Sequence, residues 1–127
     1  MNQKKINATF WVNVNGNEPV RDWLKSLDGE ERKIIGGDIK TIELGFPIGM
    51  PVCRPMGDSL YEVRSDLPDK KISRVLFCVE GSVMLLLHGF IKKERKTPKS
   101  DLDLAKKRRS EFKQEKIRQK AKNRKGE

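Results

Sequence analysis

The amino-acid sequence predicts an α+β fold, in which a small antiparallel β-sheet carries two N-terminal helices on one face and is followed by a basic C-terminal helix. Two observations support this prediction. Apolar residues recur at helical spacing between positions 20 and 42, and three stretches typical of β-strands follow one another between positions 59 and 91. The chain has 127 residues, the size of one domain. The predicted order of elements is βααβββ, before the last helix.

The N-terminal third is predicted to form one strand and two helices. Residues 6–14, INATFWVNV, are rich in β-branched and aromatic side chains, and a turn sequence, Asn-Gly-Asn, follows them. The first helix has apolar residues at positions i, i+3, i+4 and i+7, namely Val20, Trp23, Leu24 and Leu27. The second helix has its apolar residues at Ile35, Ile39 and Ile42, and Gly45 is expected to end it.

The rest of the chain predicts a loop, three strands and a third helix. Residues 45–58 hold three prolines and three glycines and are expected to be a loop. Strands are predicted at residues 59–64, 72–79 and 82–91, joined by connections short enough for hairpins. A helix is expected from Ser100, with a sparse apolar stripe at Leu102, Ala105 and Phe112. We therefore expect a domain at residues 1–112 and a basic extension at residues 113–127, either helical or disordered.

The positive charge of the chain is concentrated after the last predicted strand. Residues 1–91 hold 12 basic and 12 acidic residues, whereas residues 92–127 hold 16 basic and 6 acidic residues and so carry the whole net charge of +10. A basic segment on a neutral body indicates a polyanionic partner, with nucleic acid first, or else a solvated tail that aids solubility. The chain shows no secretory signal and no apolar run long enough to span a membrane, so a cytoplasmic location is expected.

The sequence lacks the common cofactor and metal motifs. It has neither a nucleotide-binding glycine loop nor an HExxH pattern, and its two cysteines, Cys53 and Cys78, have no metal-ligand spacing. We therefore expect no cofactor and no metal site. The available chemistry comes from arginine and lysine, together with the only histidine, His88.

Strand alternation predicts a cationic site on one face of the sheet. Arg64 and Arg74 occupy strands expected to pair as a hairpin, so both side chains can open onto one surface. The segment after Phe90 adds four cations at its edge: Lys92, Lys93, Arg95 and Lys96. Such a cluster suits a phosphate group that gains negative charge in a transition state. The alternative is that both arginines are strand residues paired with Glu62 or Asp66 and that the lysine run is a solvated turn.

The position of His88 also has two interpretations. Strict alternation places Leu86, His88 and Phe90 on one face and Leu85, Leu87 and Gly89 on the other. His88 is then either a group that exchanges protons in the site or a half-buried structural histidine.

Several linked motifs, in order, resemble a known protein family. They are LYEVR at 60–64, RVLF at 74–77, LLHGFIKKERKTP at 86–98 and DLDLAKKR at 101–108. This set is similar to the RelE/ParE toxin superfamily, and within it to the HigB-like, phage-derived Gp49-like type II toxins. The resemblance extends over roughly residues 10–112 and implies a RelE-like fold.

The resemblance also implies a function and its residues. It implies a toxin that cuts mRNA on the ribosome without a metal, by attack of a ribose 2′-OH on the adjacent phosphate, and that is silenced by a cognate antitoxin, often of the helix-turn-helix type. The residues it implies for catalysis are Arg64, Arg74, His88, Lys93 and Lys96. Those it implies for RNA contacts are Lys92, Arg95, Lys99, Lys106, Lys107 and Arg108. Two alternatives stay open: a non-cleaving toxin of the ParE type that inhibits gyrase, and a basic RNA-binding protein without catalysis.

Overall fold

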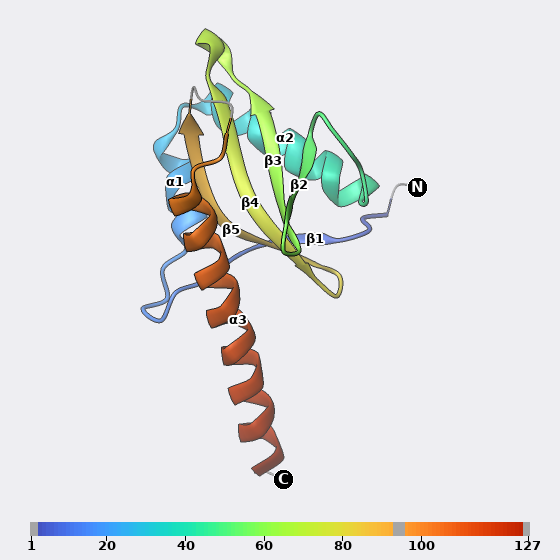
Figure 1. The fold of residues 1–127 in the computed structure, drawn as a ribbon, viewed down its shortest axis with the longest axis vertical. Helices are drawn as coiled ribbons and strands as arrows, with labels where there is room; N and C mark the ends of the chain where they lie inside the picture. The colour runs from blue at the N-terminus through green and yellow to red at the C-terminus, as the bar shows by residue number, and fades with distance from the viewer. Residues whose placement is uncertain (1–2, 93–95, 126–127) are drawn as a thin grey trace.

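A computed structural model describes residues 3–92 and 96–125, and it shows one five-stranded sheet with three α-helices (Figure 1). The strands lie in the order β1-β5-β4-β3-β2. The elements in chain order are β1 (Asn7–Phe10), α1 (Pro19–Ser26), α2 (Gly29–Gly45), β2 (Cys53–Gly57), β3 (Leu60–Asp66), a 3₁₀ turn (Pro68–Lys70), β4 (Ile72–Glu80), β5 (Val83–Lys92) and α3 (Lys99–Lys125). The predicted α+β class is confirmed.

Helices cover both faces of the sheet, and each face has its own core. In Figure 1, α1 and α2 lie behind the sheet and α3 crosses in front of it. The larger core joins the helices α1 and α2 to one face through residues such as Val20, Ile35, Val75 and Phe77. The smaller core lies under α3 and consists of Trp11, Leu60, Leu76, Cys78, Leu85, Leu87, Phe90 and Ala105. We call the face under α3 the α3 face.

The helix α2 shows how the sequence sets its own boundary. Asp28 caps it by accepting a hydrogen bond from the Glu31 backbone N–H at 2.9 Å, while the Glu31 side chain accepts one from the Asp28 N–H at 3.4 Å. This reciprocal capping box satisfies two amide groups that the first turn would otherwise leave unpaired. Glu31 also binds Lys71 at 2.6 Å, which ties the helix to the connection before β4.

The segment predicted to be a loop contains an extra edge strand. Residues 45–58 do hold a turn, but Cys53–Gly57 form β2, which pairs antiparallel with β3. Pro55 lies within this strand, and proline is tolerated there because an edge strand has one side that needs no ladder hydrogen bond. The prediction of an unbroken loop is therefore wrong over these five residues. At the opposite edge of the sheet, β1 pairs parallel with β5.

A β-bulge in β5 changes which side chains share a face. Leu76 pairs with His88 and Phe77 pairs with Leu86, so Leu87 has no partner on β4. A bulge turns two consecutive residues to the same side. Leu86 consequently joins the core under α1 and α2, whereas Leu87 belongs to the α3 face.

This bulge corrects the alternation that was predicted for β5. The prediction that Leu86 shares a face with His88 and Phe90 is wrong, and so is the grouping of Leu87 with Gly89. A Cβ at Gly89 would meet the ring of Trp23 on α1, so Gly89 lies on the opposite face from Leu87. The bulge thus turns His88 toward the α3 face.

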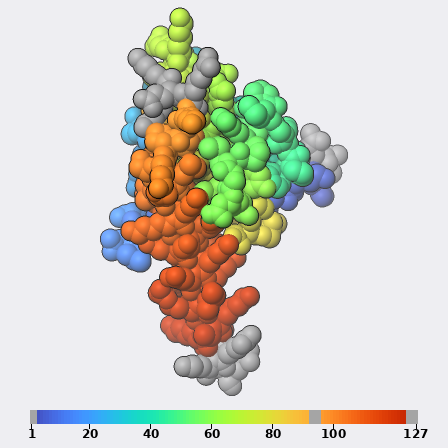
Figure 2. Space-filling view, viewed as in Figure 1, coloured from blue at the N-terminus to red at the C-terminus, as the bar shows by residue number. Residues whose placement is uncertain are grey.

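The helix α3 continues well beyond the body of the domain, as Figures 1 and 2 show. Its packed side chains end at Phe112, and from residue 113 to residue 123 every side chain is exposed. Among the described residues, no helix is both long and apolar enough to cross a lipid bilayer.

Candidate functional site

Two arginines face each other across the middle of the sheet. Arg64 on β3 is the direct partner of Arg74 on β4, and Arg74 is in turn the partner of Phe90 on β5. Directly paired residues of an antiparallel ladder lie on the same face. Since Phe90 belongs to the core under α3, both arginines open onto the α3 face. The register of the sheet therefore places Arg64 and Arg74 on one face, as strand alternation predicts.

Arg74 is the best-buried cation of the described residues. Its side chain is 2% exposed, and its Nη1 donates a hydrogen bond to Glu62 Oε1 at 2.9 Å, where the Glu62 side chain is 0% exposed. The hydroxyl of Thr97 accepts a bond from the same Nη1 at 3.3 Å and donates to Glu62 Oε2. The structure thus shows the Arg74–Glu62 pairing that the sequence left open, and places it in the interior.

This buried network fastens Thr97, which lies just before α3, to the sheet. Thr97 precedes Pro98, whose carbonyl accepts the N–H groups of Asp101 and Leu102 in the first turn of α3. A buried charge is tolerated only when its partners are held in place. Arg74 and Glu62 therefore fix Thr97, and with it the position of the neighbouring Lys96, which is exposed.

Arg64 has a different environment from its neighbour. Its side chain is half-buried, and it forms no hydrogen bond or ion pair with any other residue that the structure describes. Its cross-strand neighbour Arg74 is already paired with Glu62, so Arg64 is the guanidinium of the two that keeps its donors for an anion. Arg64 therefore has the properties of a ligand-binding group.

A third arginine on this face was missed by the sequence analysis. Arg54 on β2 is the direct partner of Glu62 on β3 and is exposed. It went unnoticed because the proline-rich stretch around it was interpreted as a loop. A signal was available, since the turn sequence Gly57-Asp58-Ser59 lies directly before a strand and is typical of a hairpin. Arg54 and Arg64 thus flank the buried Arg74–Glu62 pair.

His88 is paired with the first turn of α3. Its Nε2 lies 2.7 Å from Asp101 Oδ1, both side chains are largely buried, and the imidazole stacks on Phe90 at 5.3 Å. A carboxylate accepts hydrogen bonds only, so in the neutral ring Nε2 carries the proton and Nδ1 keeps the lone pair. The pair orients the imidazole and anchors the helix, which fits both interpretations made from the sequence.

The remaining predicted cations divide into several groups. Lys93 and Arg95 lie outside the described residues, and the side chain of Lys92 is likewise not described. Lys99 and Lys107 are exposed on α3. Lys106 lies 3.7 Å from the exposed Asp58. We call the three arginines of the sheet, Arg54, Arg64 and Arg74, the arginine row. None of the three helix cations belongs to it.

The contacts of Arg108 indicate a structural role. Its Nη1 donates to the carbonyl of the bulged residue Leu87 at 2.7 Å, and its guanidinium lies over the Trp11 ring at 5.0 Å. Burial lowers the pKa of Arg108 below the ordinary arginine value. Arg108 therefore supplies the hydrogen bond that the unpaired bulge carbonyl needs, whereas the side chain of the preceding Lys107 is exposed.

The arrangement suits binding of a phosphodiester. Arg54 and Arg64 offer guanidinium groups at the surface, the buried charge of Arg74 lies between them, and His88 provides a ring held by a carboxylate. Guanidinium forks match the geometry of phosphate oxygens, and a desolvated positive site stabilises added negative charge on phosphorus.

Comparisons with known proteins identify the family of this chain. A comparison with curated proteins finds no match. A comparison with protein families matches residues 22–110 to the family described as phage-derived protein Gp49-like (DUF891). The match includes α2, all the strands except β1, and the first half of α3, and so it includes the arginine row and its network. The chain therefore belongs to the phage-derived Gp49-like family (DUF891), which is the RelE/HigB-like toxin family.

Proposed function

We propose that this toxin is a ribosome-dependent mRNA endonuclease, which cleaves by attack of a ribose 2′-OH on the adjacent phosphate without a metal ion. The observation that carries the proposal is Arg64, a half-buried guanidinium with no partner among the described residues, on the same face as Arg54 and Arg74. Family membership supports the toxin role, and the resemblance in the linked motifs supports RNA as the substrate.

Arg64, Arg74 and His88 have distinct roles in this proposal. Arg64 binds the non-bridging oxygens of the scissile phosphate and stabilises the charge that builds up there. Arg74, paired with Glu62, positions Thr97 and with it the neighbouring Lys96. His88, held by Asp101, transfers a proton at the 2′-OH or at the leaving oxygen.

The cation segment completes the site in the same proposal. Lys96 stabilises charge beside Thr97, and Lys93 and Arg95, which lie outside the described residues, are assigned to the same rim by the resemblance. Lys99 and Lys107 contact RNA phosphates farther along the strand. The cognate antitoxin, which the family implies, is the partner that silences the activity.

The test compares Arg64→Ala with a matched arginine variant on the other face. Arg21 on α1 is exposed and is paired with Glu18 at 3.2 Å, so Arg21→Ala removes an equal charge away from the site. After brief induction, 5′ ends of cellular mRNA are mapped and growth is followed. We expect Arg21→Ala to arrest growth and to produce new 5′ ends within translated codons, and Arg64→Ala to do neither while remaining folded. Codon-associated cuts that persist with Arg64→Ala would refute the assignment.

A non-cleaving toxin is the second candidate, because the buried state of Arg74 and the pairing of His88 with Asp101 both fit a structural role. Such a toxin stops growth with transcripts intact. If growth arrest is accompanied by loss of DNA supercoiling, gyrase inhibition is the activity. If ribosomes are bound with a steep salt dependence and no cuts appear, the chain is an RNA-binding protein without catalysis.

A further inference from the structure

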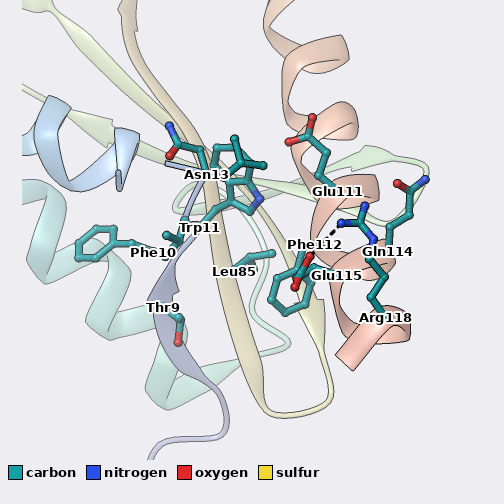
Figure 3. Close-up of a pocket in the computed structure, with 12 residues that line it drawn as sticks. Thr9, Phe10, Trp11, Asn13, Leu85, Glu111, Phe112, Gln114, Glu115 and Arg118 are labelled. Atoms are coloured by element: carbon teal, nitrogen blue, oxygen red, sulfur yellow. Dashed lines mark hydrogen bonds and ion pairs between the residues drawn. The ribbon is translucent and has the colours of Figure 1, made fainter. Parts of the chain in front are cut away.

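A groove separate from the arginine row runs between the N-terminal segment and the second half of α3. It has a volume of about 730 Å³ and is lined by residues 9–14, by Leu85 of β5 and by α3 residues between Glu111 and Arg118. Figure 3 shows Trp11 and Leu85 on one side and Phe112 on the other, with Glu111, Glu115 and Arg118 along the helix. The floor of this groove is therefore mainly apolar, and its helix wall is polar.

Exposed apolar side chains gather at this groove. Four large hydrophobic residues are strongly exposed among the described residues, and three of them, Val12 at 51%, Val14 at 96% and Ile117 at 67%, belong to the groove or to the helix beside it. The fourth, Met50 at 61%, precedes β2 at the opposite edge of the sheet. Exposed apolar groups that cluster on a polar protein mark an interaction surface.

The helix beside the groove carries an excess of positive charge. Residues 113–125 include seven basic residues and one acidic residue, Glu115, which pairs with Arg118 at 3.3 Å, and Lys113 pairs with Glu80 of β4 at 3.5 Å. Lys116 and Lys120 are one turn apart, and like charges at this spacing destabilise a helix. With no core contacts after Phe112, this stretch gains stability from a partner that supplies negative charge.

We infer that the groove and residues 113–125 of α3 together bind an acidic, amphipathic polypeptide segment, and that the cognate antitoxin supplies it. One occupant then satisfies both features: its apolar side chains cover Val12, Val14 and Phe112, and its carboxylates meet Lys116 and Lys120. This inference rests on the toxin role in the proposed function. Nucleic acid suits the groove less well, because its apolar floor of Trp11, Leu85 and Phe112 offers nothing to phosphates and matches the apolar side chains of an amphipathic segment.

The groove is distinct from the candidate catalytic face. Asp101, which holds His88, lies in the first turn of α3, whereas the groove begins at Glu111. Ten residues of α-helix span about 15 Å. A segment in the groove therefore anchors the antitoxin beside the arginine row and leaves Arg64 for a different part of the same partner.

The test measures affinity for the purified cognate antitoxin, by calorimetry. Val12→Asp combined with Val14→Asp places two charges at the groove, and Met50→Asp is the matched control at an equally exposed apolar position. We expect a loss of affinity of at least tenfold for the groove variant and no change for the control. Thermal melts check that all variants are folded, as expected for exposed positions.

A second pair of variants tests the charge of the helix. Lys116→Glu combined with Lys120→Glu reverses two cations, and the control reverses the exposed Lys33 and Lys40 on α2. We expect the helix variant to weaken antitoxin binding at least tenfold and to leave mRNA cleavage in the absence of antitoxin unchanged. Antitoxin affinities equal to those of the controls in both pairs would overturn the inference.

The outcome separates the two proposals. If the helix variant instead loses ribosome binding while it keeps the antitoxin, the helix is an RNA-binding arm and the inference is wrong. If Arg64→Ala keeps both cleavage and full antitoxin affinity, the proposed catalytic assignment fails while the inference about the groove stands.

Discussion

The buried Arg74–Glu62 pair gives the sharpest prediction about the stability of this fold. Replacing Arg74 by Met leaves the Glu62 carboxylate, which has no solvent exposure, with the neutral Thr97 hydroxyl as its hydrogen-bond donor. Replacing Glu62 by Met leaves the Arg74 guanidinium buried without the opposite charge of the Glu62 carboxylate. Breaking a buried pair by removing one partner costs about 3–5 kcal/mol. We expect each single variant to lose that amount, which is a large part of the ~5–15 kcal/mol that a domain of this size possesses.

The double variant, Arg74→Met with Glu62→Met, is expected to behave differently. It removes both charges together, so no buried charge is left without its opposite, and replacement of a buried pair by apolar groups of similar volume is often neutral. We expect the free energy of unfolding of the double variant to be at most about 2 kcal/mol lower than that of wild type. The remaining cost reflects the Thr97 hydroxyl, which loses both of its partners, and Thr97→Val in the same background should recover part of it.

Urea unfolding followed by circular dichroism measures these changes. With a slope of about 2 kcal/mol per molar urea, each single variant should lower the unfolding midpoint by about 2 M, and the double variant by under about 1 M. If both single variants lose less than about 1 kcal/mol, or if the double variant loses the sum of the two, Arg74 and Glu62 are not a desolvated, coupled pair.

Two further predictions concern the glycines and the cysteines. Gly89→Ala should lower stability by about 1–3 kcal/mol, because its Cβ meets the Trp23 ring. Gly36→Ala in α2, where the Cβ meets open space, should raise stability by about 0.5–1 kcal/mol. Thermal melts that rank the two variants the other way would contradict the packing. Burial raises the pKa of Cys53 and of Cys78 from 9.0 to about 11, so the stability they contribute is complete below pH 9 and is lost as the pH rises toward 11. Urea midpoints at pH 8 and pH 10.5 should fall less for the double alanine variant than for wild type, and an equal fall would refute the role of the thiols.

Much of the fold follows from local patterns in the sequence. The helical spacing from Val20 to Leu27 and the turn before residue 72 depend on neighbours in the chain, and the structure forms both elements where those patterns lie. The opposition of Arg64 and Arg74 also follows, because a short connection between two strands determines their register. For the same reason, the placement of both arginines on one face could be predicted without coordinates.

The features that escaped prediction depend on contacts between distant residues. The bulge at Leu87 is satisfied by Arg108, which is 21 positions away, and alternation alone contains no sign of it. Likewise, the burial of Arg74 requires Thr97 to close over it, and the sequence shows only that a carboxylate lies two positions before Arg64. Sequence patterns therefore predicted that Arg64 and Arg74 share a surface, but not which of the two water can reach.

The parallel pairing of β1 with β5 has a consequence for the order of events during synthesis. Asn7 emerges from the ribosome early, but its partner Val83 is made only after about two thirds of the chain, and α3 comes last. A growing chain thus holds β3 and β4 before it has the neighbours that shape and cover them, and folding waits for these long-range contacts. On the proposed function, a nascent chain that still lacks β5 and α3 has no His88–Asp101 pair and is inactive until both elements have been made.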